Sequence, residues 1–353
     1  MTRINMNISE FNKNKYQEFW ADLNQRLKTI EVRDGLAGAL EALRAQQRDQ
    51  GFIRDELDSV RRYKLCHPED TSRFFFVQYN PLRLERFRGL GRTSPPPGVT
   101  SIHNGCFLCP ENIRWQQCGV EVGYEIELNS RPYVAWTNAY PLMPMHVVVA
   151  TRDHIPQAWS SVDPNSTQFD CGIILRDLVS LSRKLPGYVG FYNGVGAGAS
   201  VLGHFHYQFM KRLQPETRFP LEMAPKKQNN NAHATIEDYP VKAVCWQGAP
   251  GTIVDQAVSW MHHWILNSNA TLPSPSANIF AIADDMRDHM DVYVVPRDQT
   301  RSYSSEMRGM IGGLEVLGEL VFSSDDEKRR LDLGQVDYHT VERVLSAVQP
   351  HVD

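Results

Sequence analysis

The sequence predicts an α+β protein built from antiparallel sheets with flanking helices and a helical segment at the N-terminus. Short runs rich in aromatic and β-branched residues, such as Phe74–Asn80 and His146–Ala150, recur along the chain between turn-forming segments. Residues 166–185 place apolar residues at helical spacing between two such runs. The 353 residues include 42% hydrophobic and 22% charged residues, a composition typical of a soluble globular chain.

The N-terminal segment, residues 1–65, is predicted to be helical from about Ser9 to Val60. Apolar residues recur there at spacings of three and four, as one face of an amphipathic helix requires. Asp34 is suited to cap a second helical run, and Gly51 is suited to end it. We therefore expect a pair of helices that packs on the rest of the protein.

Residues 66–215 are predicted to form the first half of the body. Pro132–Asn138 and His146–Ala150 are predicted as paired strands around a Pro-containing turn. Val189–Tyr192 is a further strand that leads into a glycine-rich loop, and Val201–Met210 returns from this loop as a strand.

Residues 216–353 are predicted to form the second half. Strands are expected at Ala277–Ala283 and Asp291–Pro296, and a closing helix at Val341–Val348. The Asn-rich segment Lys226–Asn231 is predicted to be a surface loop that could act as a lid. The return of strand-rich sequence indicates a degenerate internal duplication.

The segment Gly203–Gln208 carries the most informative pattern. On an extended strand, residues two apart share a face, so His204, His206 and Gln208 are predicted to point the same way. The preceding run Asn193–Ser200 is rich in glycine and small residues, and its backbone N–H groups can surround an anion. A histidine beside such a loop indicates phosphoryl or nucleotidyl transfer, although an H-x-H pair also occurs as hydrogen-bonded core histidines.

Cys106 and Cys109 form a C-x-x-C pair, which can hold one tetrahedral zinc ion from a tight turn. His154 and His204 are the predicted further ligands, and His146 competes with His154 for this role. Two other interpretations stay open, a redox dithiol and a pair of plain buried cysteines. Zinc is favoured because the histidines fall where further ligands are needed.

The charge pattern bounds the partners and the compartment. A net charge of −4 and a pI of about 6.3 argue against a nucleic-acid-binding surface. No apolar stretch is long enough to span a bilayer, and the N-terminus lacks the apolar core of a signal peptide, so we expect a cytoplasmic protein with no membrane partner. A basic stretch that begins at Arg83 is either solvated or reaches a phosphate.

Several of these pieces together carry a family resemblance, and they occur in the order Cys106–Cys109, Asn138–Pro141, His146–Val149, Asn193 and, eleven residues after Asn193, the H-x-H-x-Q run His204–Gln208. The combination resembles the nucleotidyltransferase branch of the histidine-triad (HIT-like) superfamily. This branch includes galactose-1-phosphate uridylyltransferases, diadenosine tetraphosphate phosphorylases and GDP-hexose phosphorylases. The resemblance implies a HIT-like antiparallel sheet and two HIT-like halves, the second of them degenerate.

The resemblance also implies a role for each site residue. His206 is the implied nucleophile on the α-phosphorus of a nucleotide, and Gln208 and Ser200 contact the transferred phosphate. The implied zinc ligands are Cys106, Cys109, His154 and His204. The implied substrate-binding residues are Asn193, Gly196, Gly198, Asn138 and Arg83.

The function implied by the resemblance is that of a phosphorylase with a covalent nucleotidyl-His206 intermediate. The donor is a nucleoside diphosphate sugar or a dinucleoside polyphosphate, and the acceptor is inorganic phosphate or a sugar phosphate. A nucleotide hydrolase with the same histidine and a non-catalytic nucleotide-binding protein are the alternatives. The nucleobase stays open, and we expect either a monomer, as a pseudo-dimer of two halves, or a homodimer.

Overall fold

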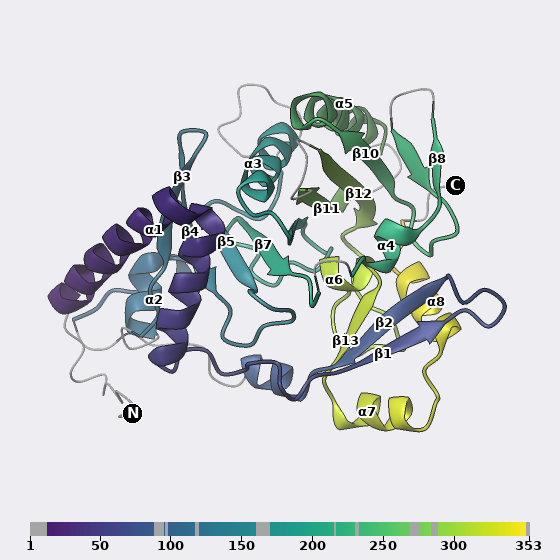
Figure 1. Cartoon of the computed structure of the whole chain (residues 1–353), viewed down its shortest axis with the longest axis horizontal. Coiled ribbons are helices and arrows are strands. Elements are labelled where there is room, and N and C mark those ends of the chain that lie inside the picture. The colour runs from purple at the N-terminus through teal and green to yellow at the C-terminus, as the bar shows by residue number, and fades with distance from the viewer. Residues whose placement is uncertain are drawn as a thin grey trace. The chain divides into compact units, whose positions relative to one another are not determined.

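The computed structural model divides into two compact units, each assembled from segments that are distant in the sequence. The first unit contains residues 1–58, 82–157 and 201–211, and the second contains residues 59–81, 158–200 and 212–353. Most of their helices and strands are labelled in Figure 1. The residues that the structure describes are 13–87, 95, 98–116, 120–159, 170–214, 217–229, 233–268, 275–283 and 289–350.

The first unit contains a wholly antiparallel four-stranded arrangement in the order β3-β4-β5-β7. Its strands are β3 (Tyr124–Leu128), β4 (Arg131–Thr137), β5 (Val147–Thr151) and β7 (His206–Lys211). Ala150 lies opposite His206 and Val148 opposite Gln208 in the β5–β7 register. These four side chains therefore share one face of the sheet, because directly paired residues point to the same side.

The long helix α1 (Lys13–Asp49) confirms the predicted N-terminal helical pair. Gly35 interrupts it with φ 77° and ψ 176°, a conformation that glycine adopts without a Cβ penalty, directly after the predicted cap Asp34. The helical prediction is wrong beyond Gly51, because residues 52–60 form no helix. The helix packs on β3 and β4, and the Trp20 and Trp136 rings meet edge to face at 5.6 Å.

Three short helical elements complete the first unit and its border. They are the 3₁₀ turns η2 (Pro81–Phe87) and η3 (His103–Gly105) and the helix α2 (Pro110–Gln116). Helix α2 begins directly after Cys109, so the C-x-x-C pair lies in the turn that leads into it.

The second unit contains a six-stranded antiparallel arrangement, in the order β6-β11-β12-β10-β9-β8, and a separate three-stranded sheet, β1-β2-β13. Strand β13 runs parallel to β2 and β1 runs antiparallel to it. The strands are β1 (Arg61–Cys66), β2 (Phe74–Tyr79), β6 (Tyr188–Asn193), β8 (Lys226–Gln228), β9 (Ala234–Ile236), β10 (Val244–Gly248), β11 (Pro275–Ala283), β12 (Met290–Asp298) and β13 (Glu319–Phe322).

Two helices of the second unit, α3 and α5, contact each other and pack on its larger sheet. Helix α3 begins with a side-chain cap, because Asp170 accepts a hydrogen bond from the backbone N–H of Ile173 at 2.7 Å. The helices of this unit are α3 (Cys171–Arg183), α4 (Pro220–Met223), α5 (Pro250–Ser268), α6 (Gly313–Val316), α7 (Asp325–Asp332) and α8 (Tyr338–Ser346).

The predicted α+β class with antiparallel sheets is confirmed. Two local predictions are wrong. Val201–Phe205 form a turn, so the strand begins only at His206, and Lys226–Gln228 form strand β8 where a loop was predicted. Asn230 and Asn231 lie outside the described residues. The proposed boundaries near residues 65 and 215 stay a prediction.

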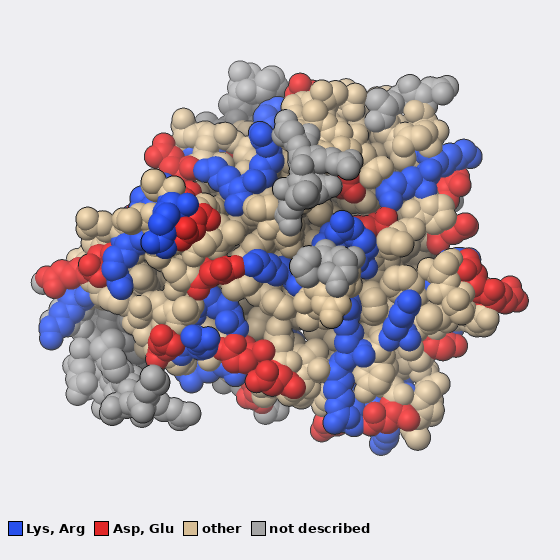
Figure 2. Space-filling view, in the orientation of Figure 1, with Lys and Arg blue, Asp and Glu red and all other residues tan. Residues whose placement is uncertain are grey.

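Positive and negative side chains are interspersed over the face drawn in Figure 2. Among the helices that the structure describes, none has the length and apolar character that crossing a membrane requires.

A buried carboxylate joins the strands of the three-stranded sheet. Glu319 of β13 has a fully buried side chain and accepts hydrogen bonds from Arg62 (3.0 and 2.6 Å) and Gln78 (3.0 Å). Burial raises the pKa of Glu319, although the ion pair with Arg62 and the bond from Gln78 oppose this. The arginine therefore offsets part of the cost of a charge in the core.

Removing this arginine is expected to destabilise the protein. Arg62→Met leaves the Glu319 carboxylate buried without its cation, which costs about 3 kcal/mol in free energy of unfolding at pH 7. The raised pKa means that the folded state holds the Glu319 proton more tightly than the unfolded chain does, so the loss shrinks as pH falls. Urea unfolding at pH 7 and pH 5.5 measures both effects. Arg61→Met, at an exposed residue of the same strand, is the control, and an equal loss in it contradicts the prediction.

Candidate active site and metal site

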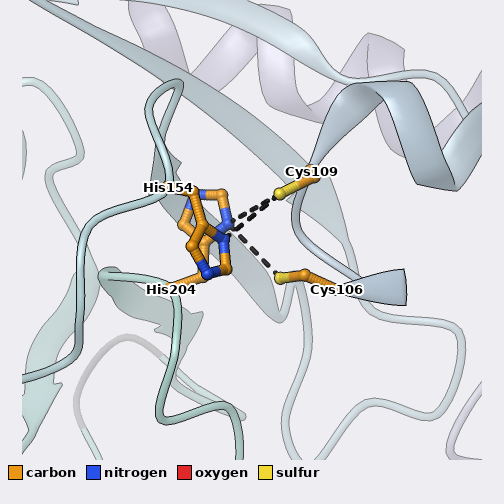
Figure 3. A group of neighbouring side chains, drawn as sticks. All are labelled: Cys106, Cys109, His154 and His204. Atoms are coloured by element: carbon orange, nitrogen blue, oxygen red, sulfur yellow. Dashed lines mark hydrogen bonds between the residues drawn. The ribbon is translucent and has the colours of Figure 1, made fainter. Parts of the chain in front are cut away.

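Four side chains from three separate segments of the first unit converge on one point (Figure 3). Cys106 and Cys109 come from the turn before α2, His154 follows β5, and His204 precedes β7. One ligand atom from each residue lies within 4.8 Å of the others. The Cys109 Sγ atom is 3.3 Å from Nδ1 of His154 and 3.5 Å from Nδ1 of His204, and Cys106 Sγ is 3.4 Å from the latter.

The surrounding hydrogen bonds prepare these atoms as metal ligands. His204 is fully buried, and its Nε2–H donates to the Thr151 carbonyl at 2.6 Å, which leaves Nδ1 unprotonated toward the cysteines. The Asn112 amide donates to the carbonyls of Ile102 and Cys106 at 2.8 and 3.1 Å, and so fixes the turn that carries the cysteines. A Cys2His2 set of this kind fits a tetrahedral metal ion, and the group can hold one.

The protonation states also suit a metal. The hydrogen bond from the Cys109 thiol, together with the contact with His204, lowers the pKa of Cys106 to about 3 against the effect of burial. The same thiol–thiolate bond, together with burial, raises the pKa of Cys109. Burial lowers the pKa of His154, so its imidazole is neutral near pH 7. A thiolate and neutral imidazoles are the forms that bind metal ions.

The structure therefore brings together the four residues predicted as ligands. His146, the competing candidate, lies outside this group and bonds to Gln208 instead. His103 stacks on the His154 ring at 4.0 Å between ring centroids, which covers the ligand from one side.

His206, the predicted nucleophile, is held in a defined orientation at the start of β7. Its Nδ1–H donates to the His204 carbonyl at 2.9 Å, so Nε2 is the nitrogen without a proton in the neutral ring. The side-chain amide of Gln157 accepts from the His206 N–H at 2.7 Å and donates to the His206 carbonyl at 3.0 Å. The Gln157 amide thus makes the two backbone hydrogen bonds to His206 that a neighbouring strand would otherwise make, on the side of β7 away from β5.

The orientation of Gln208 is set by His146. The backbone N–H of Leu142 donates to Nδ1 of His146 at 3.2 Å, so the ring proton lies on Nε2. This Nε2–H donates to Oε1 of Gln208 at 3.0 Å. The oxygen of the Gln208 amide therefore points to His146, and its NH₂ group, a pure donor, points the other way.

An apolar wall adjoins His206 on the same face of the sheet. Val148 and Ala150, opposite Gln208 and His206, pack in a hydrophobic cluster with Trp136. The other members of the cluster are Leu108, Ile113 and Val134, with Trp20, Cys106 and Val201 partly buried against it. His206 thus lies next to a buried part of the core on this face of the sheet.

The predicted phosphate loop belongs to the second unit, where it follows β6. Gly196 and Gly198 have φ of 70° and 101°, and a Cβ on them would lie only 2.4 Å from the Gln299 Cα and 2.2 Å from the Gly312 Cα. Only glycine therefore fits at both positions. Asn193, at the end of β6, is buried, whereas Ser200 is exposed.

Asn138 begins a turn of the first unit that Arg83 of η2 contacts. The Asn138 side chain accepts from the backbone N–H of Tyr140 at 3.0 Å, and its own backbone N–H donates to the His146 carbonyl at 3.0 Å. The Arg83 guanidinium donates to the carbonyl of Tyr140. Arg83 therefore braces this turn, a role that neither interpretation of the basic stretch included.

Sequence comparison covers one part of the chain. Residues 43–211 match the family described as "Domain of unknown function (DUF4922)". No curated protein sequence gives a significant match.

Comparison with solved structures covers most of the chain. The yeast Ap4A phosphorylase Apa2 is similar over 87% of this chain and 98% of that chain, with 14% identity and a TM-score of 0.56. The same yeast enzyme in complex with Ap4A gives 15% identity and a TM-score of 0.55 over 87% and 98%. An ADP-glucose phosphorylase from Arabidopsis thaliana with bound ADP-glucose has 14% identity and a TM-score of 0.37. The match covers 83% of this chain and 99% of that chain. The likeness to the yeast enzyme shows that the two chains share a fold.

Two residues of this site were not assigned from the sequence. The sequence indicates His146 only as a competing metal ligand, and its hydrogen bond to Gln208 joins the start of β5 to β7. Gln157 gave no signal, because a lone glutamine in a loop has no periodicity and no motif. Both become visible only when β5 and β7 are placed side by side.

Removal of the metal ligands is expected to abolish metal binding. We predict about one zinc ion per chain in the purified protein, and its loss in Cys106→Ser and in Cys109→Ser, because two thiolates anchor the site. Elemental analysis with a thermal melt, with and without a chelator, measures both metal content and stability. Cys66→Ser, at an exposed free cysteine, is the control. A wild-type protein that carries no zinc after expression with added zinc contradicts the assignment.

Proposed function

We propose that this chain is a nucleotidyl-transferring phosphorylase whose covalent intermediate forms on Nε2 of His206. The observation that carries the proposal is the bond from Nδ1–H of His206 to the His204 carbonyl, which makes Nε2 the nucleophilic nitrogen. The fold shared with a yeast Ap4A phosphorylase supports the reaction class.

In the first step, the Nε2 lone pair attacks the α-phosphorus of the donor. A P–N bond forms, the P–O bond to the leaving group breaks, and a sugar phosphate or a nucleotide departs with the electron pair. In the second step, an oxygen of inorganic phosphate or of a sugar phosphate attacks the same phosphorus. The P–N bond breaks, His206 is regenerated, and the product is a nucleoside diphosphate or a new nucleotide sugar.

Gln208 is proposed to hold the phosphoryl group during both steps. Its NH₂ group, directed away from His146, donates to a phosphate oxygen. An amide does not titrate near neutral pH, so it cannot take a proton from an attacking water molecule. Transfer to a phosphate acceptor is therefore favoured over hydrolysis.

The remaining substrate contacts follow the family resemblance. We propose that Asn193, Ser200 and the loop glycines Gly196 and Gly198 donate to phosphate oxygens. Asn138 and Arg83 are proposed to line the nucleotide side of the site.

The proposed metal is zinc, held by Cys106, Cys109, His154 and His204. A zinc ion bound there would join three chain segments: the turn before α2, the segment after β5 and the turn before β7. The ring of His204 is a proposed metal ligand, and its backbone carbonyl accepts the hydrogen bond from Nδ1–H of His206. A bound metal would therefore help to fix the position of the His206 ring. The cytoplasm is the proposed compartment, and a monomer or a homodimer is the proposed assembly.

Substitution of the nucleophile tests the mechanism directly. His206→Asn is expected to lower turnover at least about a thousandfold, because it removes the group that forms the intermediate. The wild-type protein, incubated with GDP-glucose, ADP-glucose, UDP-glucose and Ap4A without phosphate, should gain the mass of one nucleotidyl group at His206 by peptide mass spectrometry. His339→Asn, at an exposed histidine of α8, is the control and should keep both properties.

The acceptor is tested in the same mixtures. Added phosphate should release a nucleoside diphosphate and discharge the modified histidine. Turnover that is independent of phosphate and yields a monophosphate would show a hydrolase. Absence of both adduct and turnover across all donors would show a binding protein, and would falsify the proposal.

The identity of residue 208 is expected to control the acceptor. Gln208→His introduces a group that can relay a proton to or from water, so the ratio of hydrolysis to phosphorolysis should rise about tenfold or more. The measurement is the ratio of nucleoside monophosphate to diphosphate formed at fixed phosphate. An unchanged ratio in an active variant counts against the role given to Gln208, and Gln208→Asn, which keeps an amide, is the matched comparison.

A further inference from the structure

Arg297 of β12 is a fully buried cation in the second unit. One terminal NH₂ group of its guanidinium donates to Oδ1 of Asn278 at 2.6 Å, and the other donates to the carbonyl of Ile311 at 3.0 Å. Its Nε has no hydrogen-bond partner, and no ion pair to it is found within the described part of the chain. Burial lowers the pKa of Arg297 to about 10, although the charge of Glu315 opposes this, so Arg297 remains charged near neutral pH.

A buried charge without an ion-pair partner is costly, and such a group needs a compensating role. Arg212 of the same unit shows the ordinary arrangement, because it donates to both carboxylate oxygens of Glu222 at 2.6 Å. Arg297 instead donates to a side-chain amide oxygen and to backbone carbonyls. The amide that it holds leads directly to the glycine loop.

Asn278 of β11, also fully buried, transmits this orientation to the loop. Because Arg297 can only donate, Asn278 must turn its oxygen toward the guanidinium and its NH₂ group toward the loop. That NH₂ group donates to Oδ1 of Asn193 at 2.8 Å and to the carbonyl of Ala197 at 2.7 Å. All the groups of the Asn278 amide are thereby committed.

As a consequence, two backbone carbonyls of the loop point toward the protein interior. The Ala197 carbonyl points to Asn278, and the Gly196 carbonyl accepts from Ser302 Oγ at 2.7 Å. In a planar trans peptide the N–H points opposite to the carbonyl, so the Gly198 N–H points away from Asn278. The Asn193 amide, with its oxygen bound to Asn278, likewise turns its NH₂ group away.

We propose that Arg297, acting through Asn278, is a positioning residue that aims the donors of Asn193 and Gly198 at the phosphate of the bound nucleotide. The inference rests on the proposed function, since it takes the loop to bind phosphate. Besides ordering the donors, a fixed positive charge below the loop favours a phosphate dianion over any neutral ligand. The two side chains that position these donors, Asn278 and Arg297, thus come from the second half of the chain.

Two variants separate this role from general stability. Arg297→Met removes the cation and its donors. Asn278→Asp keeps the shape and pairs Arg297 with a carboxylate, yet presents oxygen instead of NH₂ to Asn193 and Ala197. Arg212→Met is the control, because it also removes a buried arginine of the second unit but lies outside this hydrogen-bond chain.

The readout is the phosphate-dependent part of nucleotide affinity. Calorimetry first identifies which of AMP, GMP and UMP binds the wild-type protein most tightly, and then compares that monophosphate with its nucleoside. In Arg297→Met and Asn278→Asp, the affinity for the monophosphate should fall about tenfold or more, while that for the nucleoside stays within about twofold. Arg212→Met should leave the ratio of the two affinities unchanged even if it lowers the melting temperature.

The outcomes are distinguishable from those of the proposed function. A wild-type protein that binds none of the three monophosphates overturns the proposed function and this inference together. A wild-type protein that binds one of them, with an unchanged affinity ratio in Asn278→Asp, overturns this inference alone. If Arg297→Met does not fold, Asn278→Asp still decides, because it retains the buried cation and supplies it with a counter-charge.

Discussion

The backbone carbonyl of His204 accepts a hydrogen bond from Nδ1–H of His206, and the rest of the first unit's site depends on this interaction. The His204 ring faces the cysteines through Nδ1 and holds the Thr151 carbonyl through Nε2. One residue thus links the metal-ligand cluster, strand β5 and the tautomer of the nucleophile. A displacement of the His204 ring in the metal site is therefore transmitted through the His204 backbone and one hydrogen bond to the ring of His206.

Fixed amides are the recurring device in both units. Gln157, Gln208 and Asn278 could each be turned by 180° with little change in shape, and each is held by partners with defined donor or acceptor roles. A protonated Nε2, a backbone N–H and a guanidinium can only donate, so each one selects the amide oxygen. The NH₂ group of Gln208 then faces away from His146, toward the proposed phosphoryl group, and that of Asn278 faces Asn193 and Ala197 of the loop.

These arrangements place polar groups where packing alone would favour hydrocarbon. His204, Gln157, Asn278 and Arg297 are all fully buried, and each has a specific hydrogen-bond partner. Removing one partner leaves another buried group unsatisfied, which costs more than the bond itself contributes. The sites are therefore rigid, as a transfer reaction that must exclude misplaced water requires.

Much of the fold and the ligand set could be predicted from the sequence, because the signals are local. Strand β2 ends before Pro81, α1 breaks at Gly35 beside Asp34, and the C-x-x-C spacing itself implies a shared ligand position. The start of β7 was misplaced because residues 201–205 have the composition of a strand but turn to bring His204 to the cysteines.

Tertiary structure alone decided the tautomers and amide orientations. The direction of a proton on His146 or of the NH₂ group on Asn278 depends on partners 4 to 85 residues away in the chain. The sequence by itself determined which residue types are present and, through periodicity, which elements they form. Which atom of each side chain faces the proposed substrate followed only from strand register and packing, because these bring the selecting donor within hydrogen-bond distance.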